Sequence, residues 1–273
     1  MIENIFYLSR SKYRSCGDLK LTSSIELLLA QYLIKAKPSA LFIDIDGVIT
    51  IERGSYIIDL ETVDLLRRLM SYEIPVCLVS GNAYPTVLTL QRYLGLSSVF
   101  VAENGCVIQI NKELTKLCRE NLDEIADEIE KIFSLRKSLS NLFRLCDRAF
   151  HIPEAMKADR EGVRRLERAI MEKYPYINAL YTGYVLHIYP KYCSKSNAIK
   201  IIAEKMGIEL EKAIAIGDSI TDIDMIKSVG IGVVVGDADD EAKKEAKMVL
   251  PYKASQSTKY FLIALLNYLT RAS

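Results

Sequence analysis

From residue 39 onward, the chain alternates short apolar segments with longer amphipathic segments. The apolar segments have the length and β-branched composition of buried strands, and the amphipathic ones have helical periodicity. Strands that are apolar on both faces need cover on both faces, which the intervening helices supply in a parallel sheet. The alternation therefore predicts an α/β fold with a doubly wound, Rossmann-like parallel sheet as its core. The expected strands span 40–45, 74–80, 98–105, 106–113, 212–219, 231–236 and 247–251.

Capping residues mark the ends of the helices between these strands. Asp59 is suited to cap a helix at 59–73, and Gly95 and Gly207 are suited to close two others. A further helix is expected at 22–37, with Thr22 or Ser23 as its N-cap and Pro38 as its end. The remaining helices of this part are expected at 82–95, 195–207, 222–230, 237–246 and 258–269.

Residues 112–190 do not follow this alternation. A long charged segment at 112–133 predicts a helix, a strand-like segment follows at 141–152, and a second helix is expected at 159–174. Two strand-like segments around Thr182-Gly183 predict a hairpin. Helices beside an antiparallel sheet form an α+β unit. The expected parts are an N-terminal extension with a helix (1–38), a core domain (39–111 and 191–273) and an inserted α+β cap domain (112–190).

The composition argues against several classes of protein. Lys and Arg total 36 and Asp and Glu total 35, so there is no basic excess for a nucleic-acid partner. No uncharged apolar run approaches the roughly 20 residues of a membrane span, and the N-terminal stretch lacks the apolar centre of a secretion signal. We therefore expect a cytoplasmic protein with no nucleic-acid or membrane partner, and a homo-oligomer is compatible with the sequence.

The six cysteines are dispersed and include no Cys-x-x-Cys pair, so structural zinc is not expected. Free Cys is commonly buried, and buried or half-buried thiols are expected here. A disulfide stays open as an alternative, because intracellular proteins of hyperthermophiles contain them.

The first strand of the core ends in two carboxylates. Asp44 and Asp46 close the apolar segment "ALFIDID" and directly precede Gly47. Residues two apart on a strand share a face, and a rise of about 3.3 Å per residue places their Cα atoms about 7 Å apart. Two poorly hydrated carboxylates at that separation need a cation or a shared proton between them. The pair predicts a site for a hard cation such as Mg²⁺, with an ordinary turn as the alternative for this segment alone.

A second strand ends in the same way. Asp218 and Asp222 follow the apolar segment that ends at 217. The carboxyl ends of parallel strands open on one edge of the sheet, where such folds bind ligands. We therefore expect Asp218 and Asp222 to join Asp44 and Asp46 around one cation, which favours a functional site over a turn.

Other residues are suited to a phosphate. Ser80 and Gly81 follow a third buried strand and precede a helix, so they offer a hydroxyl and free backbone N–H groups. Lys195 begins a later helix, where the dipole also attracts an anion, and it is favoured over Lys191 as the phosphate lysine. Outside this group, Arg144 and Arg148 are expected to be solvated, with contact to a substrate carboxylate as the alternative. His187 is expected to be structural, with a place facing the substrate from the cap as the alternative.

These segments together resemble the haloacid dehalogenase-like phosphatases. "DIDGVIT", "LVSGN", "SKSNAI" and "GDSITDIDM" occur in the order of that family, and "AENG" is similar to the branch with an inserted α/β cap. Within the branch, "SGNAYPTVLTLQRYLG" and "YTGYVLHIYP" resemble archaeal phosphoglycolate phosphatases. The resemblance covers about residues 39–270 and departs from the family at Thr221, where an Asn is common.

The resemblance implies a phosphatase that forms a phosphoaspartyl intermediate. Asp44 is then the nucleophile, and Asp46 protonates the leaving group and later activates water. Lys195, Ser80 and Gly81 bind the phosphoryl group of a small phosphorylated substrate, for which 2-phosphoglycolate is expected. The implied Mg²⁺ ligands are Asp44, Asp46 through its backbone carbonyl, Asp218 and Asp222.

Alternatives remain open from the sequence. Within the family, a sugar phosphatase or a mannosyl-3-phosphoglycerate-type phosphatase has the same motifs. A phospho-accepting signalling module also groups carboxylates, a hydroxyl and Lys at strand ends, but it is much shorter and has no use for the insert at 112–190.

Overall fold

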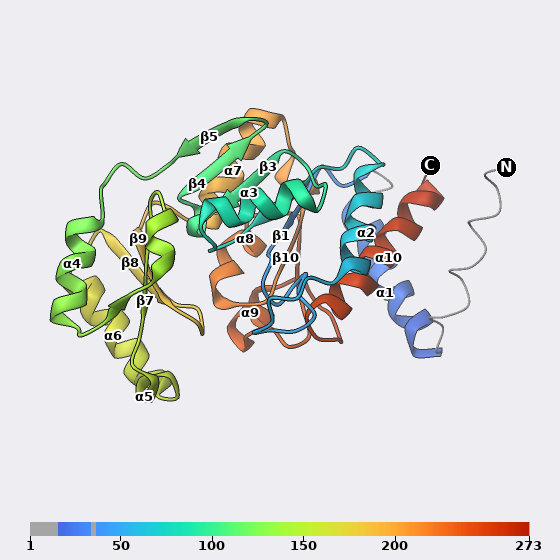
Figure 1. The fold of residues 1–273 in the computed structure, drawn as a ribbon. Coiled ribbons are helices and arrows are strands. Elements are labelled where there is room, and N and C mark those ends of the chain that lie inside the picture. Colours follow the sequence, from blue (N-terminus) through green and yellow to red (C-terminus); the bar gives the residue numbers. More distant parts are fainter. Residues whose placement is uncertain (1–15, 34–36, 273) are drawn as a thin grey trace.

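The computed structural model of the protein describes residues 16–33 and 37–272 (Figure 1). It contains an eight-stranded sheet and a separate four-stranded sheet, which confirms the predicted α/β core with an α+β insert. The predicted N-terminal helix is α1 (Cys16–Leu33), which begins before both predicted caps. Residues 34–36 of the predicted helix lie outside the described residues, and residues 37 and 38 are not helical. No helix within the described residues is long and apolar enough to cross a membrane.

The large sheet places β1 (Leu41–Ile43) between β10 (Ile214–Gly217) and β2 (Val76–Val79), and all three strands run parallel. Next to β2 lies β3 (Val99–Ala102), followed by the antiparallel β4 (Val107–Ile110) and β5 (Glu113–Lys116). Next to β10 lie β11 (Ile231–Val234) and β12 (Met248–Val249). The strand order therefore runs outward from β1 in both directions. Such a reversal of strand order opens a crevice at the carboxyl ends of the strands.

Helices cover both faces of this sheet because its central strands are apolar throughout. Leu41 and Ile43 pack with residues of α1, α2 (Leu60–Met70), α3 (Tyr84–Tyr93) and α10 (Ala254–Ala272). Phe42, between them, packs on the opposite face with α7 (Lys195–Met206) and α8 (Ile223–Lys227). The short α9 (Asp240–Glu245) precedes β12. Asp59 caps α2 and Gly207 closes α7, as predicted.

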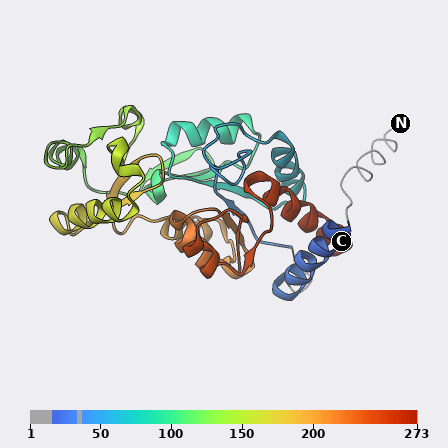
Figure 2. The same ribbon diagram turned by 90° about the horizontal axis from the view of Figure 1, so that it is seen from below.

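The smaller sheet forms a second unit that lies at one end of the molecule, away from α1 and α10 (Figure 2). Its strand order is β6-β7-β9-β8 and its pairs are antiparallel, with the predicted hairpin between β8 and β9. The helices α4 and α6 pack on it through a core of their own. We call this unit the cap. Its strands and helices are β6 (Arg136–Lys137), β7 (Arg148–His151), β8 (Ile177–Tyr181), β9 (Leu186–Pro190), α4 (Asp123–Ile132), α5 (Glu154–Lys157) and α6 (Arg160–Lys173).

The predicted long helix at 112–133 is wrong over its first half. Asn111 adopts a left-handed conformation (φ 57°), which turns β4 back into β5, and β5 pairs with β4 in the large sheet. Only α4 is helical in this segment. The strand-like segment at 141–152 is also only partly a strand, because residues 139–143 form a 3₁₀ helix before β7. The domain boundaries themselves stay predictions.

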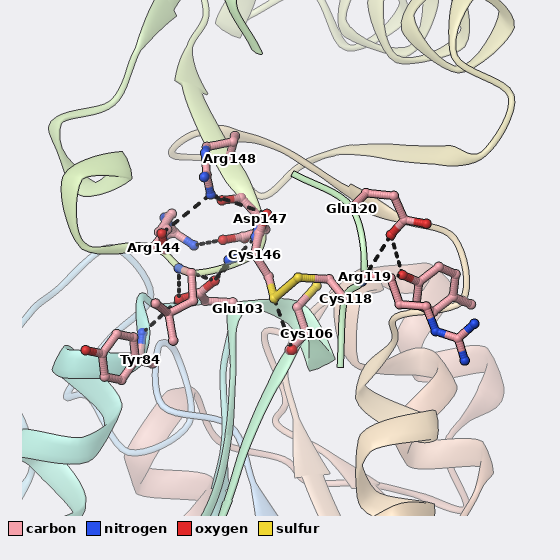
Figure 3. The surroundings of a disulfide bond; sticks show 12 residues. Tyr84, Glu103, Cys106, Cys118, Arg119, Glu120, Arg144, Cys146, Asp147 and Arg148 are labelled. Carbon is pink, nitrogen blue, oxygen red and sulfur yellow. Dashed lines mark hydrogen bonds and ion pairs between the residues drawn. A yellow bond between two sulfur atoms is a disulfide. The ribbon is translucent and has the colours of Figure 1, made fainter. Parts of the chain in front are cut away.

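A buried carboxylate and a disulfide hold the cap against the large sheet (Figure 3). Glu103, at the end of β3, accepts hydrogen bonds from the backbone N–H groups of Leu145, Cys146 and Asp147 in the cap. Cys146 forms a disulfide with Cys118, in the segment that connects β5 to the cap. The expectation of free thiols is therefore wrong for this pair, because the fold brings two residues 28 positions apart into contact. Cys77, Cys106 and Cys193 are buried free thiols.

Candidate active site

The carboxyl ends of β1, β10 and β2 bring the predicted residues to one edge of the sheet. Asp44 directly follows β1, Asp218 directly follows β10, and Ser80 directly follows β2. All three side chains are buried. Because the three strands are adjacent and parallel, their ends must converge, as the sequence predicted.

Three of the predicted metal ligands form a compact group. Carboxylate oxygens of Asp44, Asp218 and Asp222 all lie within 4.8 Å of one another. The carboxylate of Asp222 also accepts hydrogen bonds from the backbone N–H groups of Asp218 and Ser219, which fixes the turn after β10. The side chain of Asp46 is not part of this group.

Lys195 is the lysine that reaches these carboxylates. Its Nζ lies 3.0 Å from Oδ1 of Asp44 and also donates to Asp222. Burial alone would lower the pKa of Lys195, but Asp222 and Asp44 raise it above its ordinary value, so the ammonium stays charged. Lys191, by contrast, is exposed. Ser194 caps α7 and places Lys195 at the first position of that helix.

The carboxylates outnumber the cations at this edge of the sheet. Burial raises the pKa of Asp44 to about 7 and raises the pKa of Asp218 well above its ordinary range. Besides Lys195, Arg53 also reaches these carboxylates, with its Nε 2.7 Å from Asp218. The chemistry of this donor set, buried carboxylates with a deficit of positive charge, suits a divalent cation held by oxygens.

Asp46 lies beside the phosphate-binding residues predicted after β2. Its Oδ2 accepts a hydrogen bond from Nδ2 of Asn82, at 2.7 Å. Asn82 also donates to Oγ of Ser80 through both its backbone N–H and its side chain, which leaves the Ser80 hydroxyl proton free to reach a ligand. Burial raises the pKa of Asp46, so this carboxyl retains a proton at higher pH than usual.

Gly47 permits the turn that follows Asp46. Its φ is +74°, and a Cβ there would lie 2.4 Å from Oδ2 of Asp218. A side chain at this position would therefore displace the carboxylate of Asp218 from the group. The glycine keeps the metal-ligand side of the site open.

Residues of the cap close the other side of the site. A pocket of about 310 Å³ is lined by Asp44, Asp46, Ser80 and Lys195 from the large sheet and by Arg144, Tyr184 and His187 from the cap. The predicted solvation of Arg144 and Arg148 is wrong, since both are at most 9% exposed. Asp147, between them in sequence, is buried and bonds both Arg144 and His187.

Comparison with known proteins identifies the family. The sequence matches the haloacid dehalogenase-like hydrolase family over residues 41–181 and 148–262. The chain belongs to the haloacid dehalogenase-like hydrolases. It is 34% identical over 219 residues to a phosphoglycolate phosphatase of Sulfolobus acidocaldarius, covering 80% of this chain and 92% of that protein. It is 38% identical over 213 residues to a phosphoglycolate phosphatase of Staphylothermus marinus, covering 76% and 88%.

A crystal structure of a Thermoplasma acidophilum protein has the same fold as this hydrolase. The TM-score is 0.74 at 23% sequence identity, and the match covers 84% of this chain and 99% of the other. The match leaves about a sixth of this chain uncovered, which is less than the cap occupies, so the shared fold includes at least part of the cap.

Asn82 and Arg53 line the hydrolase's pocket, and Asp147 bonds two residues that line it, but none of the three was predicted as a site residue from the sequence. The sequence predicts Asn82 as the start of a helix, although its place in "SGN" beside Ser80 is a signal for the site. Arg53 gave no signal, since it lies in an irregular segment and reaches Asp218 only in the folded chain. Asp147 gave none either, because its partners Arg144 and His187 come from separate segments of the cap.

Proposed function

We propose that this hydrolase is a Mg²⁺-dependent phosphatase that converts 2-phosphoglycolate to glycolate and phosphate. The observation that carries the proposal is the group of Asp44, Lys195, Asp218 and Asp222 at the ends of adjacent parallel strands. The names of the relatives at 34% and 38% identity support the choice of substrate.

The first step uses the two aspartates after β1. A carboxylate oxygen of Asp44 bonds to phosphorus while the bond from phosphorus to the ester oxygen breaks. The leaving oxygen takes the proton of Asp46, whose raised pKa keeps that proton available. The hydrogen bond from Asn82 holds the Asp46 carboxyl in place. This step leaves an aspartyl phosphate on Asp44 and a free alcohol.

The second step regenerates Asp44. Asp46, now a carboxylate, takes a proton from water, and the water oxygen bonds to phosphorus as the acyl-phosphate bond breaks. Phosphate leaves, Asp44 is a carboxylate again and Asp46 is again protonated. Lys195 and the Ser80 hydroxyl donate to the phosphoryl oxygens in both steps, where added negative charge must be stabilised.

The donor set of this chain supports the proposed metal. Asp44, Asp218 and Asp222 would hold Mg²⁺, together with the backbone carbonyl of Asp46. When bound, Mg²⁺ neutralises the carboxylates and polarises a phosphoryl oxygen.

The experiment is a panel of phosphate esters assayed with the purified full chain and Mg²⁺. We expect the highest kcat/KM for 2-phosphoglycolate, above 3-phosphoglycerate and hexose phosphates. A preference for hexose phosphates would contradict the proposed substrate and indicate a sugar phosphatase. A stable phosphoprotein without turnover would contradict phosphatase activity altogether and indicate a signalling module.

A further inference from the structure

Arg144 projects from the cap into the pocket with only part of its guanidinium engaged. Its Nη1 donates to the carboxylate of Asp147 at 2.6 Å and to the backbone oxygen of Gly81 at 3.0 Å. Its Nε donates to Oγ of Ser140 at 3.1 Å. Its Nη2, with two N–H groups, has no hydrogen-bond partner among the described residues.

This unpaired nitrogen opens onto the pocket. Among the described residues, the only fully buried side-chain nitrogen or oxygen without a partner is Oε1 of Gln91. The Nη2 of Arg144 is therefore not sealed inside the protein, although the side chain as a whole is only 5% exposed. The accessible space next to Arg144 is the pocket that it lines together with Asp46 and Lys195.

Asp147 fixes the direction of the guanidinium. Its carboxylate is fully buried and accepts hydrogen bonds from Arg144, from Nδ2 of Asn104 and from the imidazole of His187. These partners come from the 3₁₀ segment of the cap, the end of β3 and β9. A guanidinium held at Nε and Nη1 can turn its remaining edge in one direction only.

His187 is not a second donor to the same ligand. An ionised Asp147 can only accept, so Nδ1 of His187 donates to it at 2.9 Å. The neutral ring then presents Nε2 to the pocket as an acceptor, which suits a water or a hydroxyl. Of the two residues that bond Asp147 from the cap, Arg144 is thus the one that can donate to an anionic group.

The position of Arg144 relates it to the phosphate site. The backbone oxygen that it bonds belongs to Gly81, the residue between Ser80 and Asn82. Ser80 faces the phosphoryl group and Asn82 holds the Asp46 carboxyl. An anion on Nη2 would therefore belong to the leaving-group part of the substrate, close to the ester oxygen that Asp46 protonates.

We infer that Arg144 binds the carboxylate of the leaving group, with Asp147 as its positioning residue. The substrate class is then a phosphate monoester of a short hydroxy acid, with the carboxylate within one or two carbons of the ester oxygen. This inference rests on the proposed function and names the residue that selects its substrate. The planar guanidinium suits a carboxylate better than it suits the hydroxyl groups of a sugar.

The test compares 2-phosphoglycolate with 2-hydroxyethyl phosphate, in which CH₂OH replaces the carboxylate. For Arg144→Gln we expect the ratio of the two kcat/KM values to fall about 10- to 100-fold, mostly through 2-phosphoglycolate, because a hydrogen bond to a charged group is lost. Arg148→Gln is the matched control: this arginine is equally buried but bonds Asp123 and backbone oxygens, and it does not line the pocket. The control should leave the ratio unchanged.

Two further variants guard against misfolding. Arg144→Lys keeps the positive charge, but its ammonium has only three N–H groups and cannot bond Ser140, Gly81, Asp147 and a ligand at once, so the ratio should fall here too. Asp147→Asn should move the ratio in the same direction, while a purely structural role would lower both kcat/KM values together. An unchanged ratio in folded Arg144→Gln and Arg144→Lys would overturn the inference.

A binding measurement separates this inference from the proposed function. Calorimetry on Asp44→Asn with each ester should show tighter binding of 2-phosphoglycolate, and Arg144→Gln in the same background should remove that preference. This result would support the inference even if the wild-type protein hydrolysed neither ester, which would defeat the proposed function alone. Equal binding of both esters by Asp44→Asn would overturn the inference.

Discussion

The two sides of the pocket have opposite electrostatic imbalances. On the sheet side, Asp44, Asp46, Asp218 and Asp222 face two cations, Lys195 and Arg53, so carboxylates are in excess. On the cap side, the single carboxylate of Asp147 has three donors, and Arg144 has N–H groups left over. The excess of carboxylates on the sheet side therefore favours binding of a cation, and the unpaired N–H groups on the cap side favour binding of an anion. A metal ion on one side and an acidic substrate between them would complete both.

The two sides are also built differently. The sheet side is built around Asp44, Ser80 and Asp218, which directly follow buried strands, so the packing of the sheet fixes their positions. The cap side depends on an irregular segment, residues 138–147, which is held by the carboxylate of Glu103 and by the disulfide (Figure 3). The proposed chemistry is thus on the part of the molecule that the large sheet builds, and the proposed choice of substrate is on the cap.

The largest expected effect comes from the sheet side. Asp44→Asn keeps the shape of the side chain but removes the nucleophile, and we expect kcat to fall by at least about 10⁴-fold on any phosphate ester. Phosphate release measures the effect, and circular dichroism checks the fold. Asp147→Asn, the same chemical change on the cap side, should reduce turnover of 2-hydroxyethyl phosphate far less. Comparable losses in the two variants would contradict the division of roles.

The sheet side could be predicted from the sequence because its signals are local. An apolar strand followed by an acid is visible in a few residues, and the parallel arrangement then brings Asp44 and Asp218 together. The cap side could not, because Arg144 bonds the backbone of Gly81 and its neighbour Asp147 bonds His187, and both of these partners lie in other segments. A charged residue in an irregular segment is usually solvated, and nothing nearby in the sequence indicates otherwise.

The errors in the fold have the same origin. The segment that begins at Lys112 has the charge pattern of a helix, but the left-handed Asn111 turns it into a strand partner of β4. Pairing overrode local propensity there. The bond between Cys118 and Cys146 likewise forms because the segment after β5 and the segment before β7 come into contact in the fold. Cysteine spacing alone does not reveal that contact.

The next effect concerns the contact between the large sheet and the cap, which Glu103 and the disulfide between Cys118 and Cys146 hold together. Replacing both Cys118 and Cys146 by Ser should lower the free energy of unfolding by about 3 to 4 kcal/mol, because the disulfide no longer restricts the unfolded chain. Denaturant unfolding with and without reductant measures the change, and the wild-type protein under reductant should approach the variant. If the disulfide only holds the cap in place, kcat on 2-hydroxyethyl phosphate should change little. A collapse of that activity would show that the sheet side depends on the cap.

The smallest effect is on the pH dependence of stability, measured on protein stripped of metal with EDTA. It distinguishes the excess of carboxylates on the sheet side from the excess of donors on the cap side. Burial raises the pKa of Asp44 to about 7, so the folded protein binds more protons than the unfolded chain between about pH 4 and 7. Stability on the sheet side should therefore fall as the pH rises through 7. On the cap side, burial is outweighed by Arg144 and His187, which lower the pKa of Asp147 to about 2. Its contribution should be present above about pH 4 and be lost as the pH falls toward 2.

Addition of Mg²⁺ and one substitution show which carboxylate causes the stability change near pH 7 and which causes the change at acidic pH. At 100 times its dissociation constant, Mg²⁺ should add about 2.7 kcal/mol at pH 8 and less at pH 5, since protons compete for the same carboxylates. Asp147→Asn should remove the loss of stability between about pH 4 and pH 2 and leave the stabilisation by Mg²⁺ unchanged. Thermal melting across pH measures both. A Mg²⁺ effect of equal size at pH 5 and pH 8 would mean that the buried carboxylates do not bind the cation, and the contrast between the two sides of the pocket would then lose its basis.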